Sequence, residues 1–345
     1  MVGVRVRVKL DWYWIGLGGW LALAGVVQAG DYNPLAVDPS FSPVRVELTV
    51  DDATRNRDLP VRIYLPANPA PEPVVLFSHG LGGTRAGSVF LGEHWAARGY
   101  VAVFLQHPGS DDSVWKDQPL VQRMRAMKKA ASIDNFLLRV ADVPAVLNQL
   151  EVWNADKTNP LAGRLDMKKV GMSGHSFGAV TTEAVSGETL PLEGRKFTDP
   201  RIKAAIAFSP SMPRGISAAK AFGTVKIPWL LMTGTKDLAP IGNADLKSRL
   251  GVYPTLHGAP KYEVVLFNAE HSVFTDRALT GDREPRNPNH HRVNWRCPRR
   301  SGTHICAATP ARARGWTARA RAPSWSRVTA GSYPRRSENS RAAAN

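Results

Sequence analysis

Short apolar runs alternate with segments of helical periodicity through most of the chain. The runs contain few polar residues, which suits strands that are buried on both faces of a parallel sheet. This alternation predicts an α/β protein with a mostly parallel central sheet and helices on both faces. The predicted strands are residues 44–50, 61–65, 74–78, 101–105, 170–173, 204–208, 229–233 and 262–267, and the predicted helices are residues 89–98, 120–129, 135–149 and 176–185.

The N-terminus has the pattern of a secretory signal. Three basic residues, Arg5, Arg7 and Lys9, precede an apolar run over residues 12–27, and the run ends in Val27-Gln28-Ala29. We therefore predict a signal peptide over residues 1–29 with cleavage after Ala29, and a periplasmic or secreted protein. An uncleaved membrane anchor is the second interpretation, because the apolar run is only slightly short for a spanning helix. The Pro- and Asp-rich residues 30–43 are a predicted linker to a domain over residues 44–293.

Most of the positive charge lies at the other end of the chain. Residues 294–345 hold eleven Arg and one acid, Glu338, with no Lys, Leu or Phe, and contribute +10 of the formal net charge of +16. So few aliphatic residues cannot form a packed face, so a disordered basic tail is predicted. Either this tail is a basic arm for nucleic acid or lipid headgroups, or it is the product of a shifted reading frame. We favour the shifted frame, because a functional arm normally includes Lys, and we expect no nucleic-acid partner.

No cofactor or metal is predicted. The chain contains neither a G-x-G-x-x-G motif nor a P-loop, so nothing indicates nucleotide binding. Histidines and cysteines gather near the start of the tail, but their spacing matches no standard zinc site. These residues are His290, His291, Cys297, His304 and Cys306.

A nucleophile motif stands at a predicted strand-to-helix junction. Gly174-His175-Ser176-Phe177-Gly178 has the form G-x-S-x-G, directly after the strand at residues 170–173. A serine at such a sharp turn needs a strained backbone, and glycines on either side remove side chains that would collide. Ser176 is therefore the predicted nucleophile.

A serine hydroxyl needs a base, and the base needs an acid to orient it. Asp237 follows the strand at residues 229–233, and His271 follows the strand at residues 262–267. Both therefore lie at carboxyl ends of strands, where open α/β sheets place their sites. The order Ser, Asp, His is that expected for this scaffold. We predict Asp237 as the acid and His271 as the base.

Two backbone N–H groups are candidates for an oxyanion hole. The strand at residues 74–78 runs into His79-Gly80-Leu81-Gly82-Gly83, a turn that can present the N–H of Leu81. The second donor would be Phe177, the residue after the nucleophile. We interpret His79 as a structural residue of the turn and His175 as a packing residue beside Ser176.

These motifs together resemble the α/β-hydrolase superfamily. The resemblance is closer to the bacterial dienelactone-hydrolase-like group, which is related to the platelet-activating-factor acetylhydrolase isoform II family. It covers roughly residues 44–292 and rests on residues 77–83, 96–101 and 174–179, with the contexts of Asp237 and His271. It implies a secreted or periplasmic ester hydrolase that works through an acyl-enzyme and without a metal.

Two features depart from the family pattern. Dienelactone hydrolases use a Cys nucleophile, whereas this chain has Ser176, so lactone specificity does not carry over. The family also ends with a helix after the strand that leads to the base. Residues 287–293 look like the approach to that helix, and then the pattern stops. We therefore expect the final helix to be missing.

The sequence thus predicts a serine-dependent hydrolase that cleaves small-molecule or lipid carboxylic esters. Two alternatives stay open: a non-catalytic product of a damaged gene, and a protein that binds nucleic acid or membrane through its basic tail. Membrane contact is otherwise expected only if the N-terminal segment stays uncleaved. The sequence does not indicate the oligomeric state.

Overall fold

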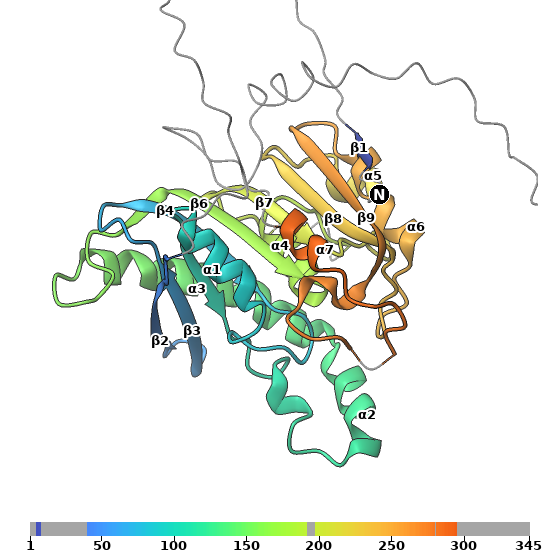
Figure 1. Cartoon of the computed structure of the whole chain (residues 1–345), viewed down its shortest axis with the longest axis horizontal. Helices are drawn as coiled ribbons and strands as arrows, with labels where there is room; N and C mark the ends of the chain where they lie inside the picture. Colours follow the sequence, from blue (N-terminus) through green and yellow to red (C-terminus); the bar gives the residue numbers. More distant parts are fainter. Residues whose placement is uncertain (1–4, 8–39, 192–196, 280, 295–345) are drawn as a thin grey trace, which may run out of the picture. The chain divides into compact units, whose positions relative to one another are not determined.

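The computed structural model describes residues 5–7, 40–191, 197–279 and 281–294. In this part of the chain nine strands form one sheet, in the order β1-β9-β8-β7-β6-β4-β5-β3-β2 (Figure 1). The strands are β1 (Arg5–Arg7), β2 (Val44–Asp52), β3 (Arg57–Leu65), β4 (Glu72–Ser78), β5 (Val101–Leu105), β6 (Leu165–His175), β7 (Ile202–Phe208), β8 (Trp229–Lys236) and β9 (Lys261–Glu270). The helices are α1 (Val89–Ala97), α2 (Leu120–Ala130), α3 (Ile133–Ala155), α4 (Phe177–Val185), α5 (Ala218–Phe222), α6 (Leu246–Leu250) and α7 (Pro288–Asn294), with 3₁₀ turns η1 (Asp112–Val114), η2 (Tyr253–Thr255) and η3 (His271–Phe274).

The centre of the sheet is parallel and its two edges are antiparallel. Strands β5, β4, β6, β7, β8 and β9 pair in parallel, each with its neighbour. At one edge β3 pairs antiparallel with β5 and β2 with β3, and at the other edge β1 pairs antiparallel with β9. The predicted α/β class with a mostly parallel sheet is therefore confirmed.

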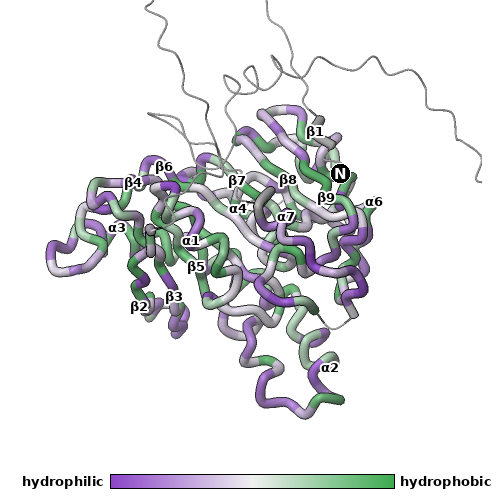
Figure 2. Tube along the Cα trace, viewed as in Figure 1, coloured by the Kyte–Doolittle hydropathy of each residue, from purple (hydrophilic) through white to green (hydrophobic). Residues whose placement is uncertain are grey.

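Apolar side chains cover both faces of the central strands. On β4, Val74 and Leu76 join a cluster with α3, whereas Val75 and Phe77 join a cluster with α1 on the opposite face. Successive side chains of a strand point to opposite faces, so a strand buried on both sides must be apolar throughout. In Figure 2 β5, one of these central strands, is green. The predicted placement of helices on both faces is confirmed.

The hairpin of β2 and β3 is longer than the apolar pattern indicates. The first predicted strand ends at residue 50 and the second begins at residue 61, but pairing continues to Asp52 and Arg57, which lie opposite each other. Backbone pairing does not require apolar side chains, and strands at the edge of a sheet commonly face water on one side. The difference therefore reflects the position of the hairpin at the edge.

The C-terminal end of the described part is helical. Residues 287–293 look in the sequence like the approach to a helix, and in the structure α7 already begins at Pro288. His290 is buried there, with Nε2 3.0 Å from the carbonyl oxygen of Phe267 on β9. The approach to the final helix is thus itself helical over Pro288–Asn294, and the residues beyond Asn294, on which the expectation of a missing helix and a basic tail rests, lie outside the described residues.

Most of the predicted N-terminal signal and linker also lies outside the described residues. Arg5–Arg7, which the sequence places in the basic part of the signal, forms β1, and Val6 is paired with Val264 of β9. Among the helices of the described ranges, none combines the length and the hydropathy needed to cross a bilayer.

Candidate active site

Ser176 lies on a strained turn between β6 and α4. Its backbone has φ 57° and ψ −114°, a conformation that non-glycine residues rarely adopt. The two motif glycines make this turn possible. A Cβ at Gly174 would lie 2.2 Å from the carbonyl oxygen of Gly178, and a Cβ at Gly178 would lie 1.9 Å from that of Ser78. Because both distances are far below van der Waals contact, side chains at these positions would displace the turn.

Ser176, His271 and Asp237 form a continuous chain of polar contacts. His271 Nε2 lies 2.8 Å from Ser176 Oγ, and His271 Nδ1 lies 2.6 Å from Asp237 Oδ1. Asp237 and His271 are buried, whereas Ser176 is partly exposed. The structure therefore brings together all three predicted residues and leaves Ser176 partly exposed.

The sheet explains how these distant residues meet. Ser176 is the residue after β6, Asp237 the residue after β8, and His271 the residue after β9. These strands are parallel, so their carboxyl ends lie at one edge of the sheet. The fold therefore places side by side three residues that together span 95 positions of the chain.

Arg249 on α6 is a fourth member of this cluster, and the sequence reasoning missed it. Its side chain is buried, with Nη2 3.3 Å from Asp237 Oδ1. Burial pushes the pKa of Asp237 upward, but the hydrogen bond to His271 and the electrostatic interactions with His271 and Arg249 outweigh it. The pKa of Asp237 is therefore lowered, and the carboxylate stays ionised at neutral pH.

His175 and His79, the two histidines next to the motifs, have structural contacts. His175 Nε2 lies 2.9 Å from the backbone oxygen of His271, and His79 Nδ1 lies 2.7 Å from that of Gly80. Both rings are buried, and burial is the main cause that lowers their pKa well below the ordinary value for histidine. These contacts agree with the structural roles predicted from the sequence.

The glycine-rich turn after β4 lies against the nucleophile. A Cβ at Gly80 would lie 3.3 Å from Nδ1 of His175 and 3.5 Å from the Cβ of Ser176, so the turn packs directly against these two residues. The turn is closed by the N–H of Gly83, which donates to Gly80 O at 3.0 Å, and is held by Trp115, whose Nε1–H donates to Gly82 O at 2.8 Å. Leu81 lies within this turn, and Phe177 is the first residue of α4, where backbone N–H groups lack intrahelical acceptors.

Comparisons with known proteins rest on structure alone. No family model matches the chain, and no curated protein matches it. Among solved structures, a candidate dienelactone hydrolase from Klebsiella pneumoniae subsp. pneumoniae MGH 78578 superposes with a TM-score of 0.51 at 15% identity, covering 74% of this chain and 96% of that one. The chain has the α/β-hydrolase fold. At this identity the likeness shows the fold and does not identify a substrate.

A second solved structure with a lower score is a cold-adapted esterase, in complex with polyethylene glycol, from an Arctic intertidal metagenomic library. It has a TM-score of 0.45 and 18% identity, and the match covers 69% of this chain and 92% of that one.

In the α/β-hydrolase fold the nucleophile stands on a sharp turn after a central strand, followed along the chain by the acid and then the histidine. Ser176, Asp237 and His271 occur in that order.

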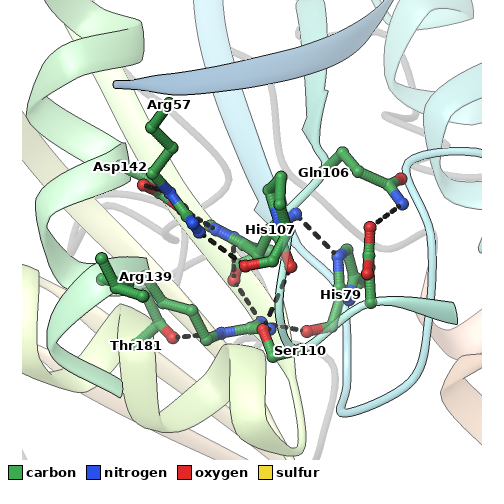
Figure 3. Close-up of polar contacts among 12 residues, drawn as sticks. Arg57, His79, Gln106, His107, Ser110, Arg139, Asp142 and Thr181 are labelled. Carbon is green, nitrogen blue, oxygen red and sulfur yellow. Dashed lines mark hydrogen bonds and ion pairs between the residues drawn. The ribbon is translucent and has the colours of Figure 1, made fainter. Parts of the chain in front are cut away.

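A second Ser–His–Asp chain lies beneath the glycine-rich turn. His107 Nε2 lies 2.9 Å from Ser78 Oγ, and His107 Nδ1 lies 2.9 Å from Asp142 Oδ2 (Figure 3). Asp142 also accepts hydrogen bonds from Arg55 and Arg57. The side chains of Ser78, His107 and Asp142 are fully buried. The sequence reasoning missed this network, although two charged residues on the apolar helix 135–149 were a signal for it.

Within residues 5–7, 40–191, 197–279 and 281–294, no group of three His, Cys, Asp or Glu side chains is arranged to hold a metal ion. His290, part of the histidine and cysteine set noted in the sequence, contacts β9 instead.

Proposed function

We propose that this chain is a serine hydrolase that cleaves carboxylic esters through an acyl-enzyme. The observation that carries the proposal is the Ser176–His271–Asp237 chain, with contacts of 2.8 and 2.6 Å and with its serine on a positive-φ turn. A strained serine within hydrogen-bond reach of a histidine that is itself held by a buried carboxylate is an arrangement that activates a nucleophile.

The proposed reaction has two halves. In the first, Ser176 Oγ attacks the carbonyl carbon of the ester while His271 Nε2 takes the hydroxyl proton. The negative charge that develops on the carbonyl oxygen is met by the backbone N–H groups of Leu81 and Phe177. The tetrahedral intermediate collapses, the C–O bond to the alcohol breaks, and His271 gives its proton to the departing alcohol.

In the second half, water attacks the acyl-Ser176 ester with His271 again as the base. The C–O bond to Ser176 breaks, the carboxylic acid leaves, and the proton returns to Ser176 Oγ. Asp237 stays ionised throughout and stabilises the positive charge on the imidazole. This scheme uses groups of the chain itself and needs no cofactor.

The surface near the glycine-rich turn favours esters with an apolar part, either small molecules or lipids. Met127 of α2 packs on Gly82, since a Cβ there would lie 2.5 Å from its Sδ. The outer side of α2 exposes Leu120, Val121 and Met124, with 81%, 89% and 51% of their surface accessible. The start of α2 is green in Figure 2. Apolar side chains this exposed are common at sites that bind apolar ligands.

A burst experiment tests the proposal. Purified protein mixed with p-nitrophenyl butyrate should release about one equivalent of p-nitrophenol rapidly and then turn over steadily, because the good leaving group makes acylation faster than deacylation and the acyl-enzyme accumulates. Ser176→Ala should remove the burst and lower turnover by several orders of magnitude. Ser186→Ala is the matched control, because its buried hydroxyl contacts Thr182 O near the far end of α4. A wild-type protein without ester turnover, or an active Ser176→Ala variant, would contradict the proposal.

We also propose that the protein is exported and that residues 1–29 are removed. Support comes from the basic residues, the apolar run and the small-residue site before Gly30. Removal would delete β1 and leave β9 as an edge strand. Intact-mass measurement of protein from the periplasm and the medium should give a mass that begins at Gly30. A protein with an intact N-terminus in the membrane fraction would support the anchor instead.

A further inference from the structure

A fully buried guanidinium lies between the glycine-rich turn and the helix that follows the nucleophile. Arg139 of α3 has no exposed surface, and its three nitrogens donate to four oxygens (Figure 3). Nε donates to Thr181 Oγ1 at 3.1 Å and Nη1 to Ser110 Oγ at 2.9 Å. Nη2 donates to Ser78 Oγ at 2.9 Å and also to the backbone oxygen of His79. Four of the five N–H donors of the planar guanidinium are thus used, in three directions.

Two of these directions lead to the two proposed oxyanion donors. The backbone oxygen of His79 lies at the start of the turn that contains Leu81. On the other side, Thr181 belongs to α4, and its hydroxyl in turn donates to the backbone oxygen of Phe177 at 3.0 Å. The guanidinium carbon also lies 4.7 Å from the centre of the Phe177 ring, a cation–π distance. One side chain therefore contacts both segments that would supply the oxyanion hole.

The surroundings keep this guanidinium charged. Burial lowers the pKa of Arg139 to about 9, and the nearby carboxylates of Asp142 and Asp111 oppose that shift, so the group stays protonated at neutral pH. Asp142 remains ionised, because its contacts with His107 and Arg57 lower its pKa despite burial. A buried charge that loses a partner is costly, so this geometry is held more firmly than neutral contacts would hold it.

The same contacts give the Ser78–His107–Asp142 chain a structural role. Ser78 Oγ accepts a hydrogen bond from Arg139, and its side chain has no exposed surface, so a substrate carbonyl cannot reach it. His107 has a pKa lowered to about 4, mainly by burial and by the charge of Arg139, so the ring is neutral at pH 7. The Ser78–His107–Asp142 chain therefore contacts the guanidinium of Arg139 through Ser78 Oγ and helps to fix its position.

We propose that Arg139 is a positioning residue. It holds the Leu81 turn and the start of α4 in a fixed position relative to each other, so that both N–H groups point at the oxyanion. This inference rests on the proposed ester hydrolysis. A donor must lie 2.7–3.1 Å from the position of the oxyanion, and displacement by about 1 Å can cost 100-fold in rate. Loss of this fixed relative position should therefore lower kcat, which depends on the transition state, more than it changes KM.

Isosteric substitution at Thr181 separates this role from general stability. Thr181→Val removes the hydroxyl that links Arg139 to α4 and keeps the volume, while Thr181→Ser keeps the hydroxyl. We expect Thr181→Val to lower kcat at least about tenfold with KM within about twofold, and Thr181→Ser to restore most of kcat. The inhibition constant of butylboronic acid, which forms a tetrahedral oxyanion on the serine, should rise in parallel with the loss of kcat.

Arg139→Lys and Arg201→Lys form the second comparison. A lysine ammonium at position 139 keeps the charge but cannot reach oxygens in three directions, so kcat should fall again. Arg201 also contacts several partners, Asp199, Glu151 and Asn148. It lies at the amino-terminal end of β7, however, whereas Ser176 lies at the carboxyl end of β6. Arg201→Lys should therefore leave kcat unchanged even where the melting temperature falls.

The outcomes are distinguishable. A wild-type burst combined with unchanged kcat and boronate affinity in a folded Thr181→Val variant overturns this inference and leaves the proposed function intact. A loss of kcat in Arg201→Lys equal to that in Arg139→Lys also overturns it, because stability alone would then explain the loss. If the wild type shows no ester turnover, the proposed function fails and the inference fails with it. Should Arg139→Lys not fold, the Thr181 pair decides the question.

Discussion

Nη2 of Arg249 lies 3.3 Å from Oδ1 of Asp237, the carboxylate oxygen that also contacts His271. Nη1 of the same arginine donates to the backbone oxygens of Ser209 and Pro210 at 2.7 and 3.0 Å. These two carbonyls follow β7, which lies between β6 and β8 in the sheet. The arginine therefore ties the orienting acid to the segment after the neighbouring strand.

Replacing this arginine should impair catalysis and shift its pH dependence. Arg249→Met removes a positive charge that lowers the pKa of Asp237, so that pKa should rise. We expect kcat/KM to fall about 10- to 100-fold and the acid limb of the pH–rate profile to move to higher pH. Arg164→Met is the control. Arg164 also donates to backbone oxygens, those of Pro66 and Asn68, but it lies at the amino-terminal end of β6, away from the carboxyl ends that carry the site. An unshifted acid limb would argue against this role.

Stability should fall as the pH drops from about 6.5 to about 4. The pKa of His107 is lowered from 6.5 to about 4, chiefly by burial. Below pH 6.5 the His107 ring binds a proton in the unfolded chain but not in the folded chain. The free energy of unfolding therefore falls over this range, by about 3 kcal/mol for this one ring. The shifts of His79 and His175 have the same direction. Guanidinium chloride titrations at pH 7, 6, 5 and 4.5 measure the slope.

The variant His107→Gln tests the assignment of that slope. Glutamine has no proton to gain in this range, so the decline in stability between pH 6.5 and 4 should become shallower, even if the variant is less stable at pH 7. An identical slope in the variant would show that other groups cause the acid sensitivity.

Neutralising the buried carboxylate of Asp142 should be strongly destabilising. Asp142→Asn leaves Arg55 and Arg57 without their buried partner, and breaking such a pair costs about 3–5 kcal/mol. Asp166→Asn, which disrupts the partly exposed pair with Lys169, should cost less than about 1 kcal/mol. Urea unfolding at pH 7 compares the two, and equal losses would mean that burial does not set the value of the Asp142 contacts.

A single added carbon at Gly178 should disable the site. In Gly178→Ala the new Cβ would lie 1.9 Å from Ser78 O, so α4 or the end of β4 must move. Because both carry parts of the proposed site, we expect activity to fall at least about 100-fold and the melting temperature to drop by several degrees. Gly87→Ala is the control, since a Cβ there would lie 3.4 Å from Thr84 O, an ordinary contact. A fully active Gly178→Ala variant would refute this expectation.

The positions of Asp237 and His271 could be predicted because each follows an apolar run. Such runs have to be strands in a parallel sheet, and parallel strands end at one edge. The true ends of β8 and β9 lie three residues later than the apolar pattern indicates, and Lys236 and Glu270 are paired across them. Backbone pairing extends the strands beyond their apolar residues, which brings the two functional residues directly to the strand ends.

Arg139 and Arg249 could not be assigned in the same way, because their partners are distant in the chain. Arg139 reaches Ser78 across 61 positions and Arg249 reaches Ser209 across 40. No periodicity links such pairs. Helix α6, which carries Arg249, has five residues, too few to show an amphipathic repeat. Arg139 and Asp142 lie three apart within an apolar helix, and this placement signals a buried polar network without naming its partners.

The two Ser–His–Asp chains of this molecule have nearly the same spacing, so a search for catalytic sites by interatomic distance alone would return both. Access separates them, since Ser176 is partly exposed while Ser78 is fully buried and receives a hydrogen bond from Arg139. An activity-based fluorophosphonate probe should consequently label the folded protein with a stoichiometry of one.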